Sequence, residues 1–415
     1  MKARQLRIEL RKKSGSRFGR IIVLTGARQT GKTTLAKKIF SEYTYLSIED
    51  PVTRSDFKNL TASQWQSLYP KAILDEVQKQ PELVESIKSV YDQYDDPRFI
   101  LLGSSQILLL DRVKESLAGR CSIFEVFPLT IPEMLTTDWD EDVKPSFLQK
   151  FIANGSIPLL PSSYKLIDGH ANAIKVFEYY LNFGGYPAII DSTLTDEERR
   201  EWLNTYIRTY LERDIRDLVN LKDLEPFVRI QKTSSILTGT SVNFSQLARE
   251  AGISSNTSQR FLRYLEISNQ AFLLKPWHKN KLKRLSKSPK LHYLDPGIQR
   301  AILRKQGLPG GNEFESAIIA EVYKQLKYVT FNGDLYHLRT NDGREVDLLI
   351  ELENGYLAIE IKMSVRITKS DARHILNLDE LLDKPLIQSF ILSNDHEIKE
   401  LAPNILAMPA ALFLS

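Results

Sequence analysis

Cysteine is almost missing from this sequence: Cys121 is the only one among 415 residues. A single thiol excludes an internal disulfide framework and a cysteine-rich zinc site, and it fits a reducing compartment. Long apolar runs are missing as well, because no segment approaches the roughly 18 residues of a transmembrane helix. The first 20 residues carry eight Lys or Arg and no apolar run, so we expect neither a secretory signal nor a membrane anchor. We therefore expect a cytoplasmic protein with no membrane partner.

A large excess of one charge is also lacking. The 56 basic and 52 acidic residues leave a net charge of +4, so the whole chain is not a polycation. Any affinity for nucleic acid must come from local basic segments. The hydrophobic fraction of 42% and the charged fraction of 26% are typical of globular domains, and the length predicts three or four of them.

Residues 1–130 predict an α/β domain. Short apolar runs of strand length alternate with helical stretches, which is typical of a parallel sheet covered on both faces. The expected strands are Arg20–Thr25, Tyr43–Ile48, Ala72–Leu74, Phe99–Leu102 and Ser122–Phe127, with helices at Pro81–Tyr91 and Ile107–Leu117 among those between them.

A phosphate-binding loop follows the first strand. Residues 26–33 fit G-x-x-x-x-G-K-[ST] and stand between a strand and a helix, where the backbone N–H groups and the helix N-terminus attract phosphate. Lys32 is expected to reach the β- and γ-phosphates of ATP, and the Thr33 hydroxyl to ligate Mg²⁺. The nucleotide-binding residues are predicted to be Gly26, Ala27, Arg28, Gln29, Thr30, Gly31, Lys32, Thr33 and Thr34.

Further catalytic candidates follow the loop. Asp75 and Glu76 end an apolar strand, so Asp75 is expected to orient the metal and Glu76 to polarise the attacking water. Ser104 or Ser105, after another buried strand, either senses the γ-phosphate or caps the next helix. Arg120 is a candidate to stabilise the transition state, within its own chain or on a neighbour in a homo-oligomer, unless it is a surface arginine.

The middle of the chain changes character. Residues 131–230 are mostly helical and predict a lid or linker. In residues 231–305, Asn243 and Ser254 or Ser255 begin two short helices about Gly252, as in a helix-turn-helix. Leu262 and Leu265 are expected inside the second helix, and its outward residues are Asn256, Gln259, Arg260 and Arg263.

The segment 275–290 is strongly basic. It holds seven Lys or Arg, one tryptophan and no acid, as expected of a wing that grips DNA phosphates between two strands. Two alternatives stay open, because winged helices also form lids and protein interfaces, and charged runs are often merely solvated.

Residues 306–415 return to an α/β pattern with helices near Asn312–Leu326 and Ser370–Leu382. A strand from Glu345 is followed by the two-residue hairpin signal Asn354-Gly355 and a return strand, which brings Asp347 beside Glu360 and Lys362. Asp followed by Glu-x-Lys is typical of restriction-endonuclease-like folds, in which Asp347 and Glu360 would hold Mg²⁺. Lys362 would position or deprotonate water or stabilise the transition state, and Glu315 would approach from a helix.

These motifs together resemble the prokaryotic AAA-type ATPases with a fused C-terminal restriction-endonuclease-like domain. The resemblance rests on residues 26–35, 74–78, 103–105, 117–120, 183–187, 210–214, 287–290 and 293–295. It implies an AAA-like core, a winged helix over residues 231–305 and a nuclease-like end. It implies no settled substrate. Ala27 stands where the family pattern has proline, which stiffens the turn less and removes no ligand.

The sequence thus predicts an α/β multidomain ATPase that uses ATP and Mg²⁺. The first hypothesis couples hydrolysis to DNA binding and metal-dependent cleavage. The alternatives are a nucleotide-driven switch that binds DNA or protein with a degenerate nuclease fold, and a regulator whose partner is another protein.

Overall fold

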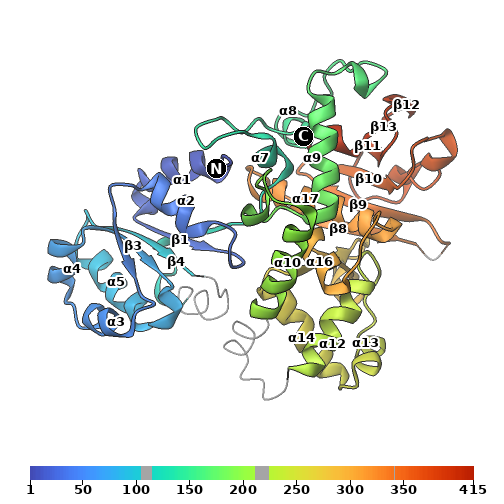
Figure 1. The fold of residues 1–415 in the computed structure, drawn as a ribbon. Helices are drawn as coiled ribbons and strands as arrows, with labels where there is room; N and C mark the ends of the chain where they lie inside the picture. Colours follow the sequence, from blue (N-terminus) through green and yellow to red (C-terminus); the bar gives the residue numbers. More distant parts are fainter. Residues whose placement is uncertain (104–114, 211–223, 341) are drawn as a thin grey trace.

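The structure is a computed structural model that describes residues 1–103, 115–210, 224–340 and 342–415. Figure 1 shows two lobes, one built on the N-terminal sheet and the other on the C-terminal sheet and the helices around it. Helix α1 and the 127–136 segment connect them.

The N-terminal sheet is parallel throughout, as the sequence predicts. Its order is β2-β3-β4-β1-β5, with bounds Thr44–Ser47, Lys71–Asp75, Arg98–Leu102, Ile21–Thr25 and Cys121–Glu125. The helices of this lobe are α1 (Leu6–Ser14), α2 (Lys32–Ile39), α3 (Pro51–Lys58), α4 (Ala62–Leu68) and α5 (Glu82–Gln93).

Strand β1 is apolar because both of its faces are buried. Ile22 and Leu24 belong to the core that α1 and α2 cover. Ile21 and Val23 point the other way, into the core that contains Trp65 of α4. This alternation fixes β1 at the centre of the sheet and places the loop that follows it at the sheet's carboxyl edge.

The C-terminal sheet is mixed and has eight strands. Its order is β12-β13-β11-β10-β9-β8-β6-β7, with bounds Lys399–Ala402, Ile405–Pro409, Leu386–Ser393, Tyr356–Lys362, Glu345–Glu351, Leu335–Arg339, Ala271–Pro276 and Lys290–Tyr293. The antiparallel pair β6–β7 joins this sheet through β8, where Lys275 and Pro276 pair with Tyr336 and His337. The predicted domain boundary at 305/306 therefore runs through one continuous sheet.

Helix α17 (Gly311–Lys327) is the central helix of the larger lobe, and 12 of its 17 residues are buried. Around it lie α7 (Ile131–Leu135), α8 (Phe147–Asn154), α9 (His170–Phe183) and α18 (Ala410–Leu414). Phe147 and Phe151 of α8 pack against Phe390 of β11. The predicted helical lid or linker thus contributes directly to the C-terminal core.

A second helical layer contains α10 (Asp196–Tyr210), α12 (Glu225–Ile236), α13 (Phe244–Ala251), α14 (Ser255–Ile267) and α16 (Pro296–Leu303). The two helices about Gly252 form as predicted, because the Asn243 and Ser254 side chains cap them. Leu262 and Leu265 are buried, as expected. The four residues of α14 expected outward are exposed.

Buried polar contacts join the two lobes. The guanidinium of Arg4 donates to the Phe127 carbonyl at 2.7 Å and lies 3.3 Å from Glu133. The Tyr328 hydroxyl accepts from the Phe127 N–H at 2.9 Å. The Ile131 N–H donates to Glu321 of α17 at 2.6 Å. Since unpaired polar groups are costly to bury, these contacts hold the 127–131 segment against α17.

Two local predictions are wrong. The helix expected at Ser370–Leu382 is absent from the described residues, where two short 3₁₀ turns, Lys369–Ala372 and Leu378–Glu380, stand instead. Asn377 has a φ of 56°, a left-handed conformation that cannot continue a helix. The β9–β10 turn is also displaced: the Leu352 N–H donates to the Gly355 carbonyl, so Glu353 and Asn354 form the turn.

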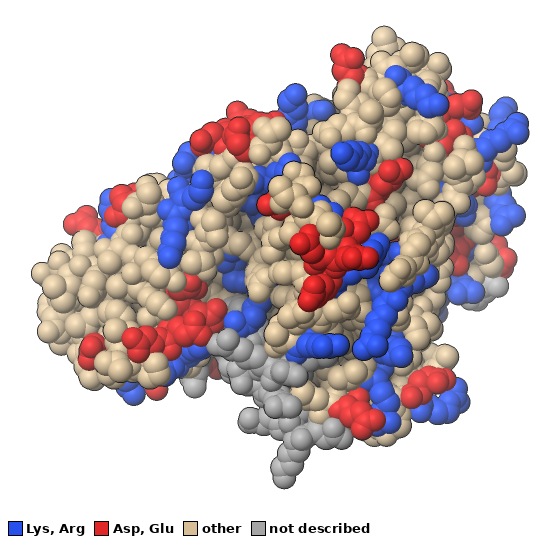
Figure 2. Space-filling model, in the orientation of Figure 1, with Lys and Arg blue, Asp and Glu red and all other residues tan. Residues whose placement is uncertain are grey.

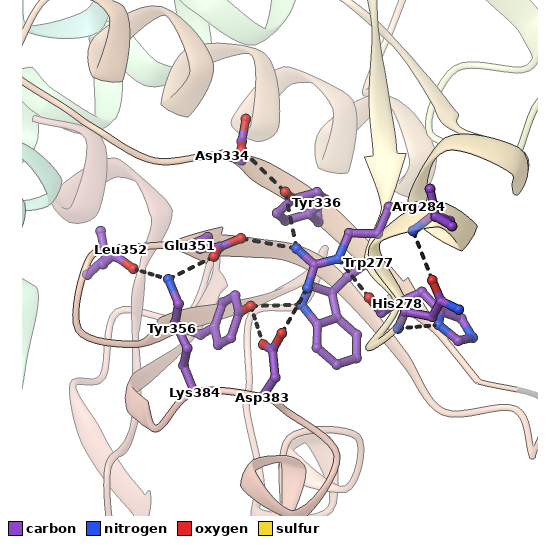
Figure 3. A network of polar contacts seen from close by, with 12 residues as sticks. Trp277, His278, Arg284, Asp334, Tyr336, Glu351, Leu352, Tyr356, Asp383 and Lys384 are labelled. Carbon is purple, nitrogen blue, oxygen red and sulfur yellow. Dashed lines mark hydrogen bonds and ion pairs between the residues drawn. The ribbon is translucent and has the colours of Figure 1, made fainter.

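The basic segment 275–290 also differs from a simple wing. It contains a helix, α15 (Lys281–Ser286), and its Arg284 is buried in a polar network with the C-terminal sheet (Figure 3). The guanidinium lies 3.2 Å from Glu351 and 3.3 Å from Asp383, and it stacks over Trp277. Arg284 therefore ties the segment to the sheet and is not available to a DNA phosphate.

Replacing Arg284 with alanine should destabilise the larger lobe. Breaking a buried ion pair costs about 3–5 kcal/mol, and we expect about 3 because Glu351 keeps Lys384 at 2.8 Å. For a unit of this size the expected fall in Tm is about 6–12 °C, measured by calorimetry. The control is Arg263→Ala on exposed α14, which should shift Tm by less than about 2 °C. Equal shifts in the two variants would contradict a buried tie at Arg284.

Candidate functional site

The loop after β1 takes the backbone conformations that phosphate binding requires. Gly26, Gln29 and Gly31 have φ values of 134°, 60° and 90°. A side chain at Gly26 would meet the Val126 carbonyl oxygen at 2.2 Å, so only glycine fits there. Such alternation of backbone conformations turns successive N–H groups toward one point, which is the geometry of an anion-binding nest.

Lys32 and Thr33 begin α2 directly behind this loop. The Lys32 ammonium donates to the Gly26 and Ala27 carbonyls at 2.9 and 2.7 Å, so it lies over the loop. The Thr33 hydroxyl donates to the Asp75 carboxylate at 2.8 Å. The structure thus brings Lys32, Thr33 and Asp75 together, as the sequence predicts. A hydroxyl beside a carboxylate is a donor set that suits Mg²⁺.

Tyr45 is a site residue that sequence reasoning missed. Its hydroxyl donates to the same Asp75 oxygen at 2.9 Å, and burial together with Asp75 raises the pKa of Tyr45 to about 12. The neutral phenol therefore positions Asp75 throughout the physiological pH range. The signal that could have indicated this role is the position of Tyr45 on β2. This strand pairs with β3, and Ser47 of β2 lies opposite Asp75.

Glu76 has a φ of 59°, which is uncommon for a residue with a side chain. Its N–H donates to Asp75 at 3.0 Å, and its carboxylate accepts from the Gln78 amide. Strained backbone of this kind persists where the surrounding structure holds it, and it concentrates at functional sites. Here the left-handed conformation of Glu76 ends β3 at the edge of the sheet that carries the loop.

A pocket of about 320 Å³ opens beside the loop. Thr30, Gly31 and Thr34 form one side of it. The other sides come from the N-terminal segment and from two distant turns, through Met1, Lys2, Arg4, Leu129, Pro187, Ala188 and Ile190. Pockets of this size with mostly apolar walls and a few polar groups are typical small-molecule sites.

The turn at residues 184–187 connects this pocket to the helical layer. The Gly185 N–H donates to Asp295 at 2.8 Å, and the Gly185 carbonyl accepts from the Leu129 N–H at 2.7 Å. Asp295 also caps α16 through the Ile298 N–H. Side chains would not fit, since a Cβ on Gly184 would lie 1.9 Å from Asp295 and one on Gly185 2.2 Å from the Leu129 oxygen.

The structure does not describe one predicted catalytic residue and places another away from the loop. Ser104, with its neighbour Ser105, and most of the predicted helix Ile107–Leu117 lie outside the described residues. Arg120 precedes β5, whose first residue pairs with Ile21 at the start of β1. It is therefore at the opposite edge of the sheet from the loop, where it pairs with Asp92 at 2.8 Å. Action on its own nucleotide is inconsistent with this place, and action on a neighbouring chain stays a prediction.

The C-terminal constellation assembles as the hairpin predicts. Asp347 on β9 accepts from the Ile361 N–H at 2.8 Å, and Lys362 on β10 donates to Glu360 at 2.6 Å. Glu315 of α17 approaches the same place, because the Lys290 ammonium lies 3.0 Å from Glu315 and 3.8 Å from Asp347. The four predicted residues are thus neighbours.

The structure adds a fifth residue that the sequence did not indicate. Lys290, the first residue of β7, is 3% exposed, and its ammonium lies 3.0 Å from Glu315, 2.8 Å from Glu345 and 3.8 Å from Asp347. Burial disfavours its charge, but the three carboxylates outweigh burial and raise the pKa of Lys290. Within the basic segment, the only sign of this role is that Lys290 opens the strand Lys290–Tyr293.

No group of three or more His, Cys, Asp or Glu side chains in the described residues is arranged to hold a metal ion. Nor does any described helix have the length and apolar composition needed to cross a bilayer.

Comparison with known proteins addresses the N-terminal lobe most directly. Residues 19–135 match a family model described as an AAA domain. This part of the chain is similar to AAA-type P-loop domains. Residues 174–308 and 310–413 match two further models, each described as a domain of unknown function. The chain is therefore an α/β multidomain protein with an ATPase-type, nucleotide-binding domain at its N-terminal end.

Whole-chain relatives are also without an assigned role. Uncharacterized proteins of Mycobacterium tuberculosis (Rv2008c) and Mycobacterium bovis (Mb2031c) are each 27% identical over 407 residues, which cover 95% of this chain and 81% of theirs.

Solved structures show a more distant likeness. The Walker-type ATPase PABY2304 of Pyrococcus abyssi has a TM-score of 0.44 at 16% identity, over 72% of this chain and 95% of that one. The STAND protein PH0952 of Pyrococcus horikoshii has a TM-score of 0.28 at 11% identity, over 77% and 45%. At these TM-scores the likeness adds nothing to the argument.

Gly184→Ala should destabilise the protein and weaken the pocket beside the loop. The added Cβ must displace the Asp295 carboxylate, so we expect a loss of at least about 3 kcal/mol of unfolding free energy. Gly155→Ala is the matched control, because Gly155 also has a positive φ, 66°, but nothing lies within 4 Å of its added Cβ. Its expected cost is about 1 kcal/mol. Thermal melts compare the two, and equal costs would show that the Gly184–Asp295 contact is unimportant.

Proposed function

We propose that the N-terminal domain hydrolyses ATP with Mg²⁺ and that the rest of the chain responds to the nucleotide. The observation that carries this proposal is the contact of Thr33 with Asp75 beside a loop whose Lys32 covers Gly26 and Ala27. The AAA-domain match over residues 19–135 supports it.

Each residue then has a distinct role. Thr33 and Asp75 would hold Mg²⁺, which would supply charge that neutralises the phosphates. Lys32 exchanges its carbonyl contacts for phosphate oxygens. Tyr45 keeps Asp75 in place, and Glu76 takes a proton from the attacking water.

The pocket beside the loop suits the base of the nucleotide. Thr34 and Gly31 lie on its phosphate side, while Leu129, Pro187 and Ile190 offer apolar surface to a flat ring. Leu129 bonds Gly185, and Gly185 bonds Asp295, which caps α16. A bound base would therefore touch segments that connect to this cap. This gives the nucleotide a direct route to the helical layer.

The P-loop assignment predicts that Lys32→Ala and Glu76→Gln behave differently. Lys32→Ala should lose both Mg·ATP binding and turnover, because its ammonium is the main phosphate counter-charge. Glu76→Gln should keep binding and lose turnover by about 10²–10⁴-fold, the usual contribution of a general base. Calorimetry of binding and phosphate release measure the two effects.

Matched controls are Lys38→Ala on α2 and Glu82→Gln on α5, both exposed and both expected to keep wild-type rates. Wild-type turnover in Glu76→Gln would remove Glu76 from the mechanism. An absence of heat on adding Mg·ATP to nucleotide-free, folded protein would reject the whole proposal.

We propose further that residues 231–305 form a winged helix that contacts DNA. The exposed face of α14, with Asn256, Gln259, Arg260 and Arg263, supports this. The basic segment contributes less than its composition indicates, since Arg284 and Lys290 are buried in ion pairs. Figure 2 shows Lys and Arg interspersed with Asp and Glu over the face it presents, so DNA contact would rest on local groups.

Lys275, Lys279 and Lys287 are three exposed lysines of the basic segment that can contact phosphate. Replacing all three with alanine should reduce the slope of log affinity against log salt by up to about three, near 0.9 for each lost contact. The control replaces three exposed lysines elsewhere, Lys12, Lys165 and Lys369, and should leave the slope unchanged. Filter binding across a salt series measures the slopes. Equal slopes in the wild type, the triple variant and the control would assign the basic segment to protein contacts.

The sequence also predicts metal-dependent cleavage by four residues, Asp347, Glu360, Lys362 and Glu315. We favour the alternative, a nucleotide-driven switch that does not cleave. The reason is that Lys290 places a positive charge among the carboxylates that a nuclease would use for metal.

A further inference from the structure

The carboxylate cluster of the C-terminal sheet brings four acids together, two of them buried and two partly exposed. Glu345 and Asp347 share a face of β9, Glu360 lies on the neighbouring β10, and Glu315 comes from α17. Asp347 and Glu360 are 8% and 3% exposed. Like charges at this depth repel each other strongly, so the cluster requires cations.

Two lysines supply positive charge. Lys362 bonds Glu360 and is partly exposed, whereas Lys290 reaches Glu315, Glu345 and Asp347 from a strand that leaves the helical layer. The ammonium groups of both lysines lie within hydrogen-bond or ion-pair distance of these carboxylates.

The nearby histidines do not add to this charge. Burial and Lys290 lower the pKa of His337 to about 4, and burial lowers that of His292 well below its usual value. His374 uses its Nδ1 to accept from the Glu345 N–H, so this nitrogen carries no proton. Lys290 is therefore the buried cation of the cluster in the described residues.

The position of Lys290 does not fit a divalent ion in the same place. Mg²⁺ would need Asp347 as an oxygen ligand, and the Lys290 ammonium already lies 3.8 Å from Asp347 and 3.0 Å from Glu315. A second cation at that distance would be repelled in a poorly solvated site. Glu360 Oε2 is buried and accepts no hydrogen bond in the described structure, which marks a ligand position that the lysines leave unfilled.

We propose that Lys290 is a tethered cation that replaces the metal ion of this cluster, and that removing its charge unmasks a divalent-metal site. Because the lysine belongs to the same chain, its effective concentration exceeds that of free metal in a cell. The ammonium also holds the β6–β7 pair against β9, so one residue both masks the site and joins the helical layer to the C-terminal sheet.

The test measures Mn²⁺ binding to the nucleotide-free full chain by electron paramagnetic resonance and calorimetry. Lys290→Met should bind one more Mn²⁺ than wild type, at least ten-fold more tightly than any site the wild type has in this region. Its Tm should be lower than that of wild type without metal and should rise with Mn²⁺. Lys290→Arg keeps the cation and should behave as wild type, and so should Lys165→Met, which changes an exposed lysine elsewhere in the chain.

Two double variants keep the test decisive. Lys290→Met with Asp347→Asn should lose the added Mn²⁺. Lys290→Met with Glu345→Gln removes one repelling charge, so it should fold if the single variant does not, and it keeps Glu315, Asp347 and Glu360 for the metal. Equal Mn²⁺ binding by wild type and Lys290→Met, or binding that survives Asp347→Asn, would overturn the proposal. ATP turnover is a separate readout, so failure here leaves the P-loop assignment intact.

Discussion

The pairing of buried polar groups on helix α17 is the constraint on which the architecture depends. This helix is surrounded on nearly all sides, yet it carries Glu315, Glu321 and Lys324. Glu321 and Lys324 are fully buried and pair at 2.7 Å, and Glu321 also accepts from the Ile131 N–H. An unpaired charge at such depth would cost several kcal/mol, so each neighbouring segment must supply its partner in one fixed position.

The same helix therefore relates the two candidate sites. At one end Glu315 belongs to the carboxylate cluster with Lys290. Just beyond the other end, Tyr328 bonds Phe127 and Arg4, and Arg4 lines the pocket beside the P-loop. A nucleotide that moved the N-terminal segment would act on a rigid, fully packed helix. Such an element transmits small displacements because a close-packed interior does not absorb them.

Much of the N-terminal domain was predictable. Apolar runs such as Ile21–Thr25 match a buried parallel strand in length and composition, and the loop motif fixes its own backbone. Asp75 and Thr33 came together because Asp75 ends β3 and Thr33 begins the helix after β1, and the carboxyl ends of these parallel strands share one edge. Local signals failed where long-range packing determines the structure. Nothing near Asn377 forbids a helix in isolation. The position of the Leu352–Gly355 turn is set by the register of the two strands that it joins.

The sequence by itself determined the phosphate loop, the strands of the parallel sheet and the list of acids in the C-terminal hairpin. Each of these depends on residues close together in the chain or on a repeating pattern. The tertiary structure alone decided the fate of the basic segment: a sequence counts seven positive charges there, but it does not show which of them meet acids from other segments. Arg284 and Lys290 turn inward because Glu351, Asp383, Glu315 and Glu345 reach them from elements 25 to 99 residues away.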